Sequence, residues 1–253
     1  MKYFFSVLLV AGSSLLAPLP APAQTTFRLG PTAGYSLSSA SFQVADYPDY
    51  FTTTHAYHGG LQGGVLAQVA FGGHFAVQPA VLYAHQAPGF GTSSYYPPGN
   101  YSTRQEYTLA LNYLSVALPL LVSQRASGRG AQVFAGPYLG WLLGGTYRNR
   151  TGATRGPAVP DQDTDSFSGP VEAGDTYATG SQAGTYRLRR LDAGLQVGVG
   201  YGFEALQLQA DVSWGLRNIG PAYAPTAAHP YEAPVIRSRG FHLTAAYLFE
   251  RKH

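Results

Sequence analysis

The sequence predicts an all-β protein, namely an eight-stranded antiparallel up-and-down transmembrane β-barrel. Three observations predict this fold. Apolar and polar residues alternate with a period of two over most of the chain, and short and long connections between these segments alternate as well. Charged residues make up only 11% of the chain, against about 25% in ordinary soluble domains. Glycine and tyrosine are frequent, with 31 and 19 residues.

The N-terminal segment has the features of a secretory signal peptide. Lys2 is the only charge before the apolar run YFFSVLLVAGSSLLAPLP, and Ala21 and Ala23 occupy the small-residue positions that a signal peptidase reads. A retained membrane anchor is the alternative, but the run is short and prolines break its end. We predict that residues 1–23 are cleaved and that residues 24–253 form a single outer-membrane domain.

Eight segments carry the alternation. The clearest is LDAGLQVGVGYGF, in which the odd-numbered positions are apolar and the even-numbered positions are polar or glycine. The fifth segment alternates less cleanly than the others. The predicted strands span about 27–37, 60–71, 75–86, 107–123, 132–148, 191–203, 206–218 and 240–249.

The connections between these segments differ in length in a regular way. GGH, ASGRG and EA form three tight connections, whereas residues 38–58, 87–106, 149–184 and 218–235 form four long ones. Outer-membrane barrels have short periplasmic turns and long external loops. The sequence therefore predicts four long external loops.

The composition of the two strand faces indicates which one meets lipid. If the apolar face pointed inward, the outer surface would consist mainly of Gly, Gln and Ala with few charges, which is a poor soluble surface. We therefore expect the apolar face to meet lipid and the lumen to be a packed polar network without an open pore. The predicted lumenal side chains are Gln62, Gln68, Gln78, Gln196, Gln207, Gln209, Arg28, Arg190, Asp192, Asp211 and Arg217.

Aromatic residues near the strand ends are expected to form girdles at the two membrane interfaces. The alternative is that aromatic side chains simply favour strands. The expected girdle residues are Tyr35, Phe71, Phe75, Tyr83, Tyr107, Tyr147, Tyr201, Phe203, Tyr247 and Phe249.

Three stretches resemble the PorT-like outer-membrane β-barrel family. They are YLSVALPLLV, FAVQPAVLYAHQAPG and RRLDAGLQVGVGYGFEALQLQADVSWGLRNI, and the resemblance spans about residues 27–249. It implies an eight-stranded barrel in the outer membrane of a Gram-negative cell. Some members of the family take part in protein secretion and gliding, but no residue here supports that role.

The sequence departs from the family pattern in three places. Ser115 replaces the usual acidic residue of the fourth strand, and the family's lysine in the third-strand motif is absent. Phe249 is followed by ERKH, so a C-terminal assembly signal would be internal.

The sequence contains two candidate metal sites. Asp161, Asp163, Asp165 and Glu172 follow the spacing of a calcium-binding loop, but glycine is missing at the sixth position, so an acidic solvated loop is the simpler interpretation. His55 and His58 form an HxxH pair without a third ligand nearby. The chain has no cysteine, and we predict no resident metal and no cofactor.

A catalytic arrangement in the lumen is a second possibility. His242 is expected to face the lumen near Asp211 and Asp192, with Ser115 and Ser213 on the same wall. A Ser-His-Asp arrangement would suit a lipid-modifying enzyme, but a structural polar network explains the same residues without catalysis. We therefore expect no enzymatic activity.

The external regions suggest partners. Arginines flank the third long loop and are suited to phosphates of lipopolysaccharide, and aromatic residues populate the first two loops, where they favour recognition of a protein. The arginines are Arg148, Arg150, Arg155, Arg187, Arg189 and Arg190, and the aromatic residues are Tyr47, Tyr50, Phe51, Tyr57, Tyr95, Tyr96 and Tyr101.

The sequence as a whole predicts a monomeric, non-enzymatic outer-membrane protein with a structural or interaction role. Removal of Lys2 leaves 15 basic and 13 acidic residues, a near-balance that does not suit nucleic-acid binding. The alternatives are a small barrel enzyme acting on lipid and a secreted soluble barrel that binds a small ligand.

Overall fold

The computed structural model describes residues 26–43, 51–71, 73–96, 101–155, 162–176, 184–222 and 233–250. The predicted signal peptide, residues 1–23, lies outside this part of the chain. Among the described residues no helix is long and apolar enough to cross a membrane. These residues form fifteen β-strands and one short 3-10 helix, Ala126–Gly128.

The strands are numbered along the chain. They are β1 (Thr26–Gln43), β2 (Phe51–Ala56), β3 (His58–Phe71), β4 (Phe75–Val77), β5 (Ala80–Gln86), β6 (Gly89–Tyr96), β7 (Tyr101–Ala117), β8 (Leu120–Arg125), β9 (Arg129–Arg155), β10 (Gln162–Ala173), β11 (Tyr186–Leu188), β12 (Leu191–Gly202), β13 (Leu206–Gly215), β14 (Val235–Tyr247) and β15 (Phe249–Glu250).

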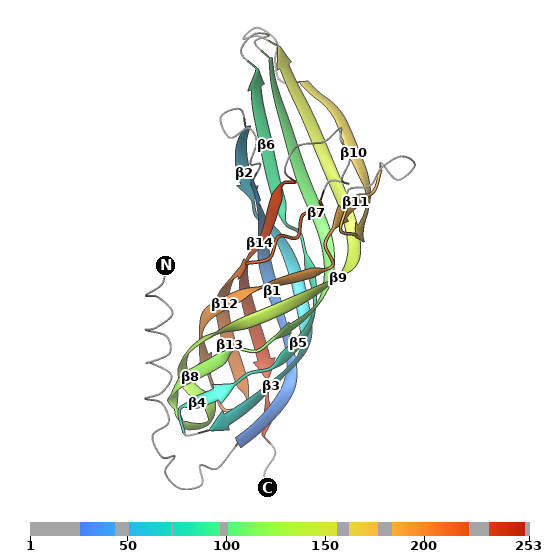
Figure 1. The fold of residues 1–253 in the computed structure, drawn as a ribbon. Coiled ribbons are helices and arrows are strands. Elements are labelled where there is room, and N and C mark those ends of the chain that lie inside the picture. The colour runs from blue at the N-terminus through green and yellow to red at the C-terminus, as the bar shows by residue number, and fades with distance from the viewer. Residues whose placement is uncertain are drawn as a thin grey trace, which may run out of the picture.

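The antiparallel pairings form a closed series. β1 pairs with β14 on one side and with β3 on the other. From β14 the ladder continues through β13 and β12 to β9, and from β3 it continues through β4 and β5 to β7 and β8, which also pair with β9. Figure 1 shows these strands wrapped into a tilted tube in the lower part of the molecule.

All eight predicted segments are strands, but several are interrupted. The third segment consists of β4 and β5, and the fourth consists of β7 and β8; the breaks fall at Pro79 and Pro119, which have no backbone N–H to donate. The ladder nevertheless continues across both breaks, because Gln78 N donates to Pro119 O at 2.9 Å and Leu118 N donates to Pro137 O at 3.0 Å.

The predicted tight connections are confirmed. Gly73 (φ +82°) lies between β3 and β4, and Ser127 (φ 60°) and Gly128 (φ +70°) lie between β8 and β9. Phe203 N donates to Leu206 O at 2.7 Å in the turn that joins β12 to β13. All three turns leave the tube at the same end.

The prediction of four long external loops is wrong for the first three, because these connections consist largely of strands. Much of that sequence is strand: β2, β6 and β10 lie entirely within it, and β1, β7 and β9 extend into it. β2 pairs with β6, β6 with β7, β7 with β9 and β9 with β10, all antiparallel. We call these strands, beyond the point where they leave the tube, the external sheet; it rises above the tube in Figure 1.

A β-bulge marks the point where β9 passes from the tube to the external sheet. Asn112 pairs with Gly144 and Tyr113 pairs with Leu142, so Leu143 has no partner in the ladder. Gly144 has φ +137°, a conformation that favours glycine. The inserted residue moves the outward-facing side chains of β9 from odd-numbered to even-numbered positions.

Candidate functional site

The outer wall of the tube is apolar. Val197, Val199 and Leu208 are 43%, 58% and 44% exposed, and large apolar side chains on the other strands are exposed in the same way. The buried polar side chains of the tube lie inside it and include Arg28, Gln68, Gln78, Gln132, Asp192, Gln207 and His242. A soluble barrel has the opposite arrangement. This orientation confirms the prediction that the apolar face of residues 191–203 points outward.

Aromatic side chains border the apolar wall. At the end with the tight turns, Phe71 and Phe75 stack with ring centroids 6.4 Å apart, and Tyr201 and Phe203 lie 4.9 Å apart. Eight of the ten expected girdle residues are exposed: Tyr35, Phe71, Phe75, Tyr83, Tyr201, Phe203, Tyr247 and Phe249.

Tyr107 and Tyr147 do not belong to this border. They pack against Tyr186 with ring centroids 6.0 and 5.5 Å away, on the inner side of the external sheet. Their assignment to a girdle was therefore wrong.

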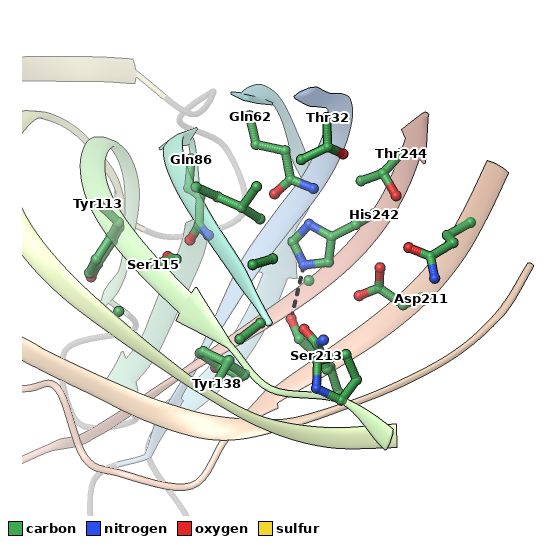
Figure 2. A pocket seen from close by; sticks show the side chains of 18 of the residues that line it. Thr32, Gln62, Gln86, Tyr113, Ser115, Tyr138, Asp211, Ser213, His242 and Thr244 are labelled. Carbon is green, nitrogen blue, oxygen red and sulfur yellow. Dashed lines mark hydrogen bonds between the residues drawn. The ribbon is translucent and has the colours of Figure 1, made fainter. Parts of the chain in front are cut away.

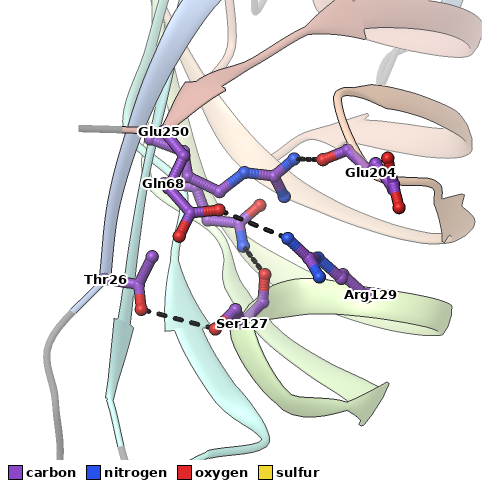
Figure 3. A network of polar contacts seen from close by, with 7 residues as sticks. Thr26, Gln68, Ser127, Arg129, Glu204 and Glu250 are labelled. Carbon is purple, nitrogen blue, oxygen red and sulfur yellow. Dashed lines mark hydrogen bonds and ion pairs between the residues drawn. The ribbon is translucent and has the colours of Figure 1, made fainter. Parts of the chain in front are cut away.

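Polar side chains fill the lumen at the turn end (Figure 3). Arg28, 2% exposed, donates from its guanidinium to the carbonyl of Glu204. Gln68 donates to Ser127 O at 3.0 Å, and Arg129 pairs with Glu250 at 3.3 Å. These contacts join β1, β3, β15 and the β8–β9 and β12–β13 turns across the opening of the tube.

A network of glutamine amides continues inward from this end. Gln78 donates through Nε2 to Gln68 Oε1 and Gln207 Oε1, both at 3.1 Å, and accepts from Gln209 Nε2 at 2.9 Å. Gln207 in turn donates to Gln132 at 2.7 Å. The amides satisfy one another without a charge, which is the condition under which a buried polar network stabilises a protein.

A cavity of about 90 Å³ lies above the amide network. Ser115, Asp192, Asp211, Ser213 and His242 all line it, as predicted. Ser213 Oγ lies 3.1 Å from His242 Nε2, and Asp211 pairs across the strands with His242 (Figure 2). Ligand pockets measure about 300–1,000 Å³, so this cavity is smaller than one.

The Ser213–His242 pair lacks the third member of a catalytic triad. His242 Nδ1 is buried and has no hydrogen-bond partner among the described residues. In a triad this nitrogen donates to a carboxylate that orients the ring. Ser213 and His242 are therefore placed like the serine and histidine of a triad, but no described carboxylate orients the histidine ring.

Asp192 forms a second polar contact in the cavity that the sequence did not indicate. Its Oδ2 accepts from Ser238 Oγ at 2.6 Å, and Ser238 also contacts the Tyr138 hydroxyl at 3.1 Å. Ser238 lies upstream of the predicted eighth strand, and Tyr138 lies on the predicted strand with the weakest alternation, so neither position indicated a lumenal partner.

An apolar cluster covers the other end of the lumen. Phe90 is 2% exposed and stacks between Phe42 and Tyr107, with ring centroids 5.1 and 5.0 Å away. The buried members of this cluster are Ala40, Phe90, Leu109, Leu111, Tyr113, Leu142, Val171, Leu188, Ile219 and Ile236. They lie where β1, β14 and β11 meet the external sheet. The lumen is thus filled at both ends.

Comparison with known families agrees with this arrangement. A family model described as an outer membrane protein beta-barrel domain matches residues 22–220 of the chain. The chain belongs to this family. At this level the prediction of an outer-membrane β-barrel is confirmed, and the finer resemblance to PorT-like barrels stays a prediction.

Several solved outer-membrane proteins resemble this barrel at low similarity. The attachment invasion locus protein Ail of Yersinia pestis is 9% identical with a TM-score of 0.37, over 88% of this chain and 99% of that chain. OprG of Pseudomonas aeruginosa is 12% identical with a TM-score of 0.37, over 90% and 97%. Neisserial surface protein A is 14% identical with a TM-score of 0.33, over 88% and 97%. No curated protein matches the chain.

Two residues predicted in the lumen of the barrel lie outside it. Arg190 is exposed and lies over the outward-facing Trp141, 5.4 Å from its ring centroid. Arg217 is also exposed, because β13 ends at Gly215 and the alternation no longer applies beyond it. The other nine predicted lumenal residues are buried in the lumen or line its cavity.

The predicted arginine cluster divides into two groups. Arg148 and Arg150 are exposed on the outward face of the external sheet, whereas Arg187 and Arg189 are partly buried. The side chain of Arg155 lies outside the described residues. Arg237 and Arg239, on β14, are further exposed arginines; they lie between the predicted loop at 218–235 and the predicted strand at 240–249, so no sequence pattern indicated them.

Only some of the candidate metal residues belong to the described part of the chain. Glu172 is exposed on β10, while Asp161 and the side chains of Asp163 and Asp165 lie outside the described part of the chain. His55 Nδ1 contacts the carbonyl of Ala40 at 3.0 Å. Over the residues that the structure describes, no three His, Asp or Glu side chains are placed to hold a metal ion.

The loop aromatics predicted to recognise a partner are only partly visible. Tyr57, between β2 and β3, is 54% exposed, and Tyr95, on β6, is 52% exposed. Tyr47, Tyr50 and the side chains of Phe51, Tyr96 and Tyr101 lie outside the described residues.

Proposed function

We propose that this chain is a non-enzymatic, PorT-like, eight-stranded barrel of the Gram-negative outer membrane. In this proposal residues 1–23 are a cleaved signal peptide, and the external sheet gives the protein a structural or interaction role. The observation that carries the proposal is a closed ladder of strands with an apolar outer wall and a filled polar interior. The proposal takes β4 with β5 and β7 with β8 as single strands, which together with β1, β3, β9, β12, β13 and β14 make the eight strands of the barrel.

The same observation supports the absence of an open pore. Arg28 and the glutamine amides fill one end of the lumen, and the cluster around Phe90 covers the other. A lumen of this kind stabilises the barrel but does not conduct ions.

Heat-modifiability and conductance test this proposal. We expect the refolded protein to migrate faster on a gel when unboiled than when boiled, and to remain in the membrane pellet after a carbonate wash. In planar bilayers it should give no steady ion conductance. A soluble protein without a gel shift would contradict the barrel, and stepwise conductance of the folded protein would contradict the closed lumen.

The partners proposed for the barrel are outer-membrane lipid, including lipopolysaccharide, and a protein that contacts the external sheet. The exposed arginines of the external sheet, such as Arg148 and Arg150, support a contact with lipid phosphates. Exposed Tyr57 and Tyr95 support a contact with protein. We propose that the barrel itself is monomeric and binds no nucleic acid.

An enzyme acting on lipid is the second candidate, because Ser213 lies within hydrogen-bond distance of His242. The incomplete triad and the small volume of the cavity support a structural role instead. We expect a fluorophosphonate probe, which labels activated serines, to leave Ser213 unlabelled in the folded barrel. Labelling that disappears in both the Ser213→Ala and His242→Ala variants would favour the enzyme.

A further inference from the structure

A broad hollow lies on the outward face of the external sheet. Its volume is about 920 Å³, and it extends from His58 across β7 and β9 to β10. One row across the hollow consists of Thr108, Arg148 and Ser168, which are neighbours on β7, β9 and β10. On β6, Gly89 pairs with Thr108 and continues this row. The His58 ring packs against Gly89, because a Cβ atom at that position would lie only 2.6 Å from the ring.

The hollow carries two exposed arginines. Arg148 and Arg150 lie two residues apart on the same face of β9, so their Cα atoms are about 7 Å apart. Both side chains are exposed, and neither forms an ion pair with a described residue. Glu106, the acidic residue in the hollow, is already paired with Arg104 at 2.5 Å.

The chemistry of the lining favours a phosphate. Guanidinium groups bind phosphate through two parallel hydrogen bonds, and two arginines at this spacing can hold one phosphate between them or two neighbouring ones. The hydroxyls of Thr108 and Ser168 flank Arg148 on either side and add neutral donors.

The height of the hollow places it beside lipid headgroups. On β9 the outward side chains Leu139, Trp141 and Leu143 are apolar, and after the bulge at Gly144 the outward positions carry Arg148 and Arg150. At about 3.3 Å per residue and a strand tilt near 40°, Arg148 lies roughly 13 Å beyond Leu143 along the barrel axis. Because this face continues the lipid-facing wall, a molecule in the hollow also contacts the membrane.

We propose that this hollow binds the phosphate groups of a phosphorylated glycolipid of the outer leaflet, with Arg148 and Arg150 as the principal ligands. The inference rests on the proposed function, since it needs the barrel to span the outer membrane. It specifies which of the exposed arginines bind the lipid phosphates. It also distinguishes a specific binding site from general electrostatic attraction to anionic lipid.

The test uses the full-length mature barrel, refolded in uncharged detergent micelles and titrated with lipid A. Native mass spectrometry counts bound lipid, and the two probes are diphosphorylated lipid A and the same lipid after phosphatase treatment. We expect the wild type to bind the phosphorylated form at least about tenfold more tightly, since hydrogen bonds to charged groups are the strong ones. Arg148→Gln/Arg150→Gln should remove this preference.

The Arg237→Gln/Arg239→Gln variant is the matched control, because these exposed arginines have the same spacing on β14 and the same charge is removed. It should keep most of the preference. Arg148→Lys/Arg150→Lys, which keeps the charge but loses the paired geometry, should lie in between. The unboiled gel band of each variant verifies that it is folded.

Three results would overturn the inference. They are equal binding of both lipids by the wild type, an equal loss in the two glutamine double variants, and complete displacement of lipid A by an equimolar amount of inorganic phosphate, which would indicate a soluble anion as the ligand. Failure of the wild type to give a fast unboiled band would instead contradict the proposed barrel itself.

Discussion

Replacement of Val197 by arginine is expected to destabilise the barrel in a membrane by about 2–4 kcal/mol, the cost of an arginine near the bilayer midplane of a barrel. Val197 lies in the middle of β12, pairs with Val212 across the strands, and is 43% exposed on the apolar outer wall. The free energy of unfolding can be measured by urea titration in lipid vesicles, with Trp141 and Trp214 as fluorescent reporters. We also expect a smaller fraction of the variant to reach the fast-migrating form.

Thr52→Arg is the control for this substitution. Thr52 is exposed on β2 of the external sheet, so the same arginine meets water there and should change the unfolding free energy by less than about 0.5 kcal/mol. If Val197→Arg were as stable as Thr52→Arg, the outer wall of the tube would not face lipid. A core-facing or water-facing position would then have to be assigned to residues 191–203.

The second large effect is expected at the centre of the lumen. Gln78 is 1% exposed and forms hydrogen bonds with Gln68, Gln207 and Gln209. Gln78→Ala removes all three bonds, leaves buried amides without partners and opens a cavity. Each unsatisfied buried group costs about 1–3 kcal/mol, so we expect the free energy of unfolding to fall by about 3–5 kcal/mol in the same vesicle assay.

Two variants separate the causes of that loss. Gln78→Met keeps the volume but not the hydrogen bonds, and it should recover only the part that comes from the cavity. Gln196→Ala makes the same truncation beside the lumenal cavity, where Gln196 has no hydrogen bond to a described residue, and it should cost about 1 kcal/mol or less. If Gln78→Ala and Gln196→Ala lowered the free energy of unfolding equally, the hydrogen bonds of the amide network would not contribute to stability.

Neither the candidate catalytic pair nor the phosphate-binding hollow could be established from sequence. The alternation along β13 and β14 placed Ser213 and His242 on the lumenal face, but only the pairing register brings the hydroxyl within 3.1 Å of the ring. The sequence marked Arg148 and Arg150 as flanking a loop. Their place in a hollow depends on β6, β7 and β10, which lie beside β9 only in the folded chain.

The external strands escaped prediction for a related reason. Both faces of a sheet above the membrane meet water over much of their length, so strands such as β2 and β6 lack the alternation of apolar and polar side chains that marks the tube. Their threonine and tyrosine residues favour strands, but the same composition, interspersed with proline and glycine, also suits loops. The pairing partners, rather than the local sequence, decide between the two.

The strands of the tube, the tight turns and the direction of most side chains on those strands could be predicted from the sequence. These features follow from a period-two pattern and from low charge, both of which are local properties of the chain. The tertiary structure alone decided the bulge at Gly144, the outward position of Arg190 and the closure of the lumen by side chains from distant strands. The physical reason is that a shift of one residue in strand register reverses which face each side chain occupies, and register is set by partners far away in the sequence.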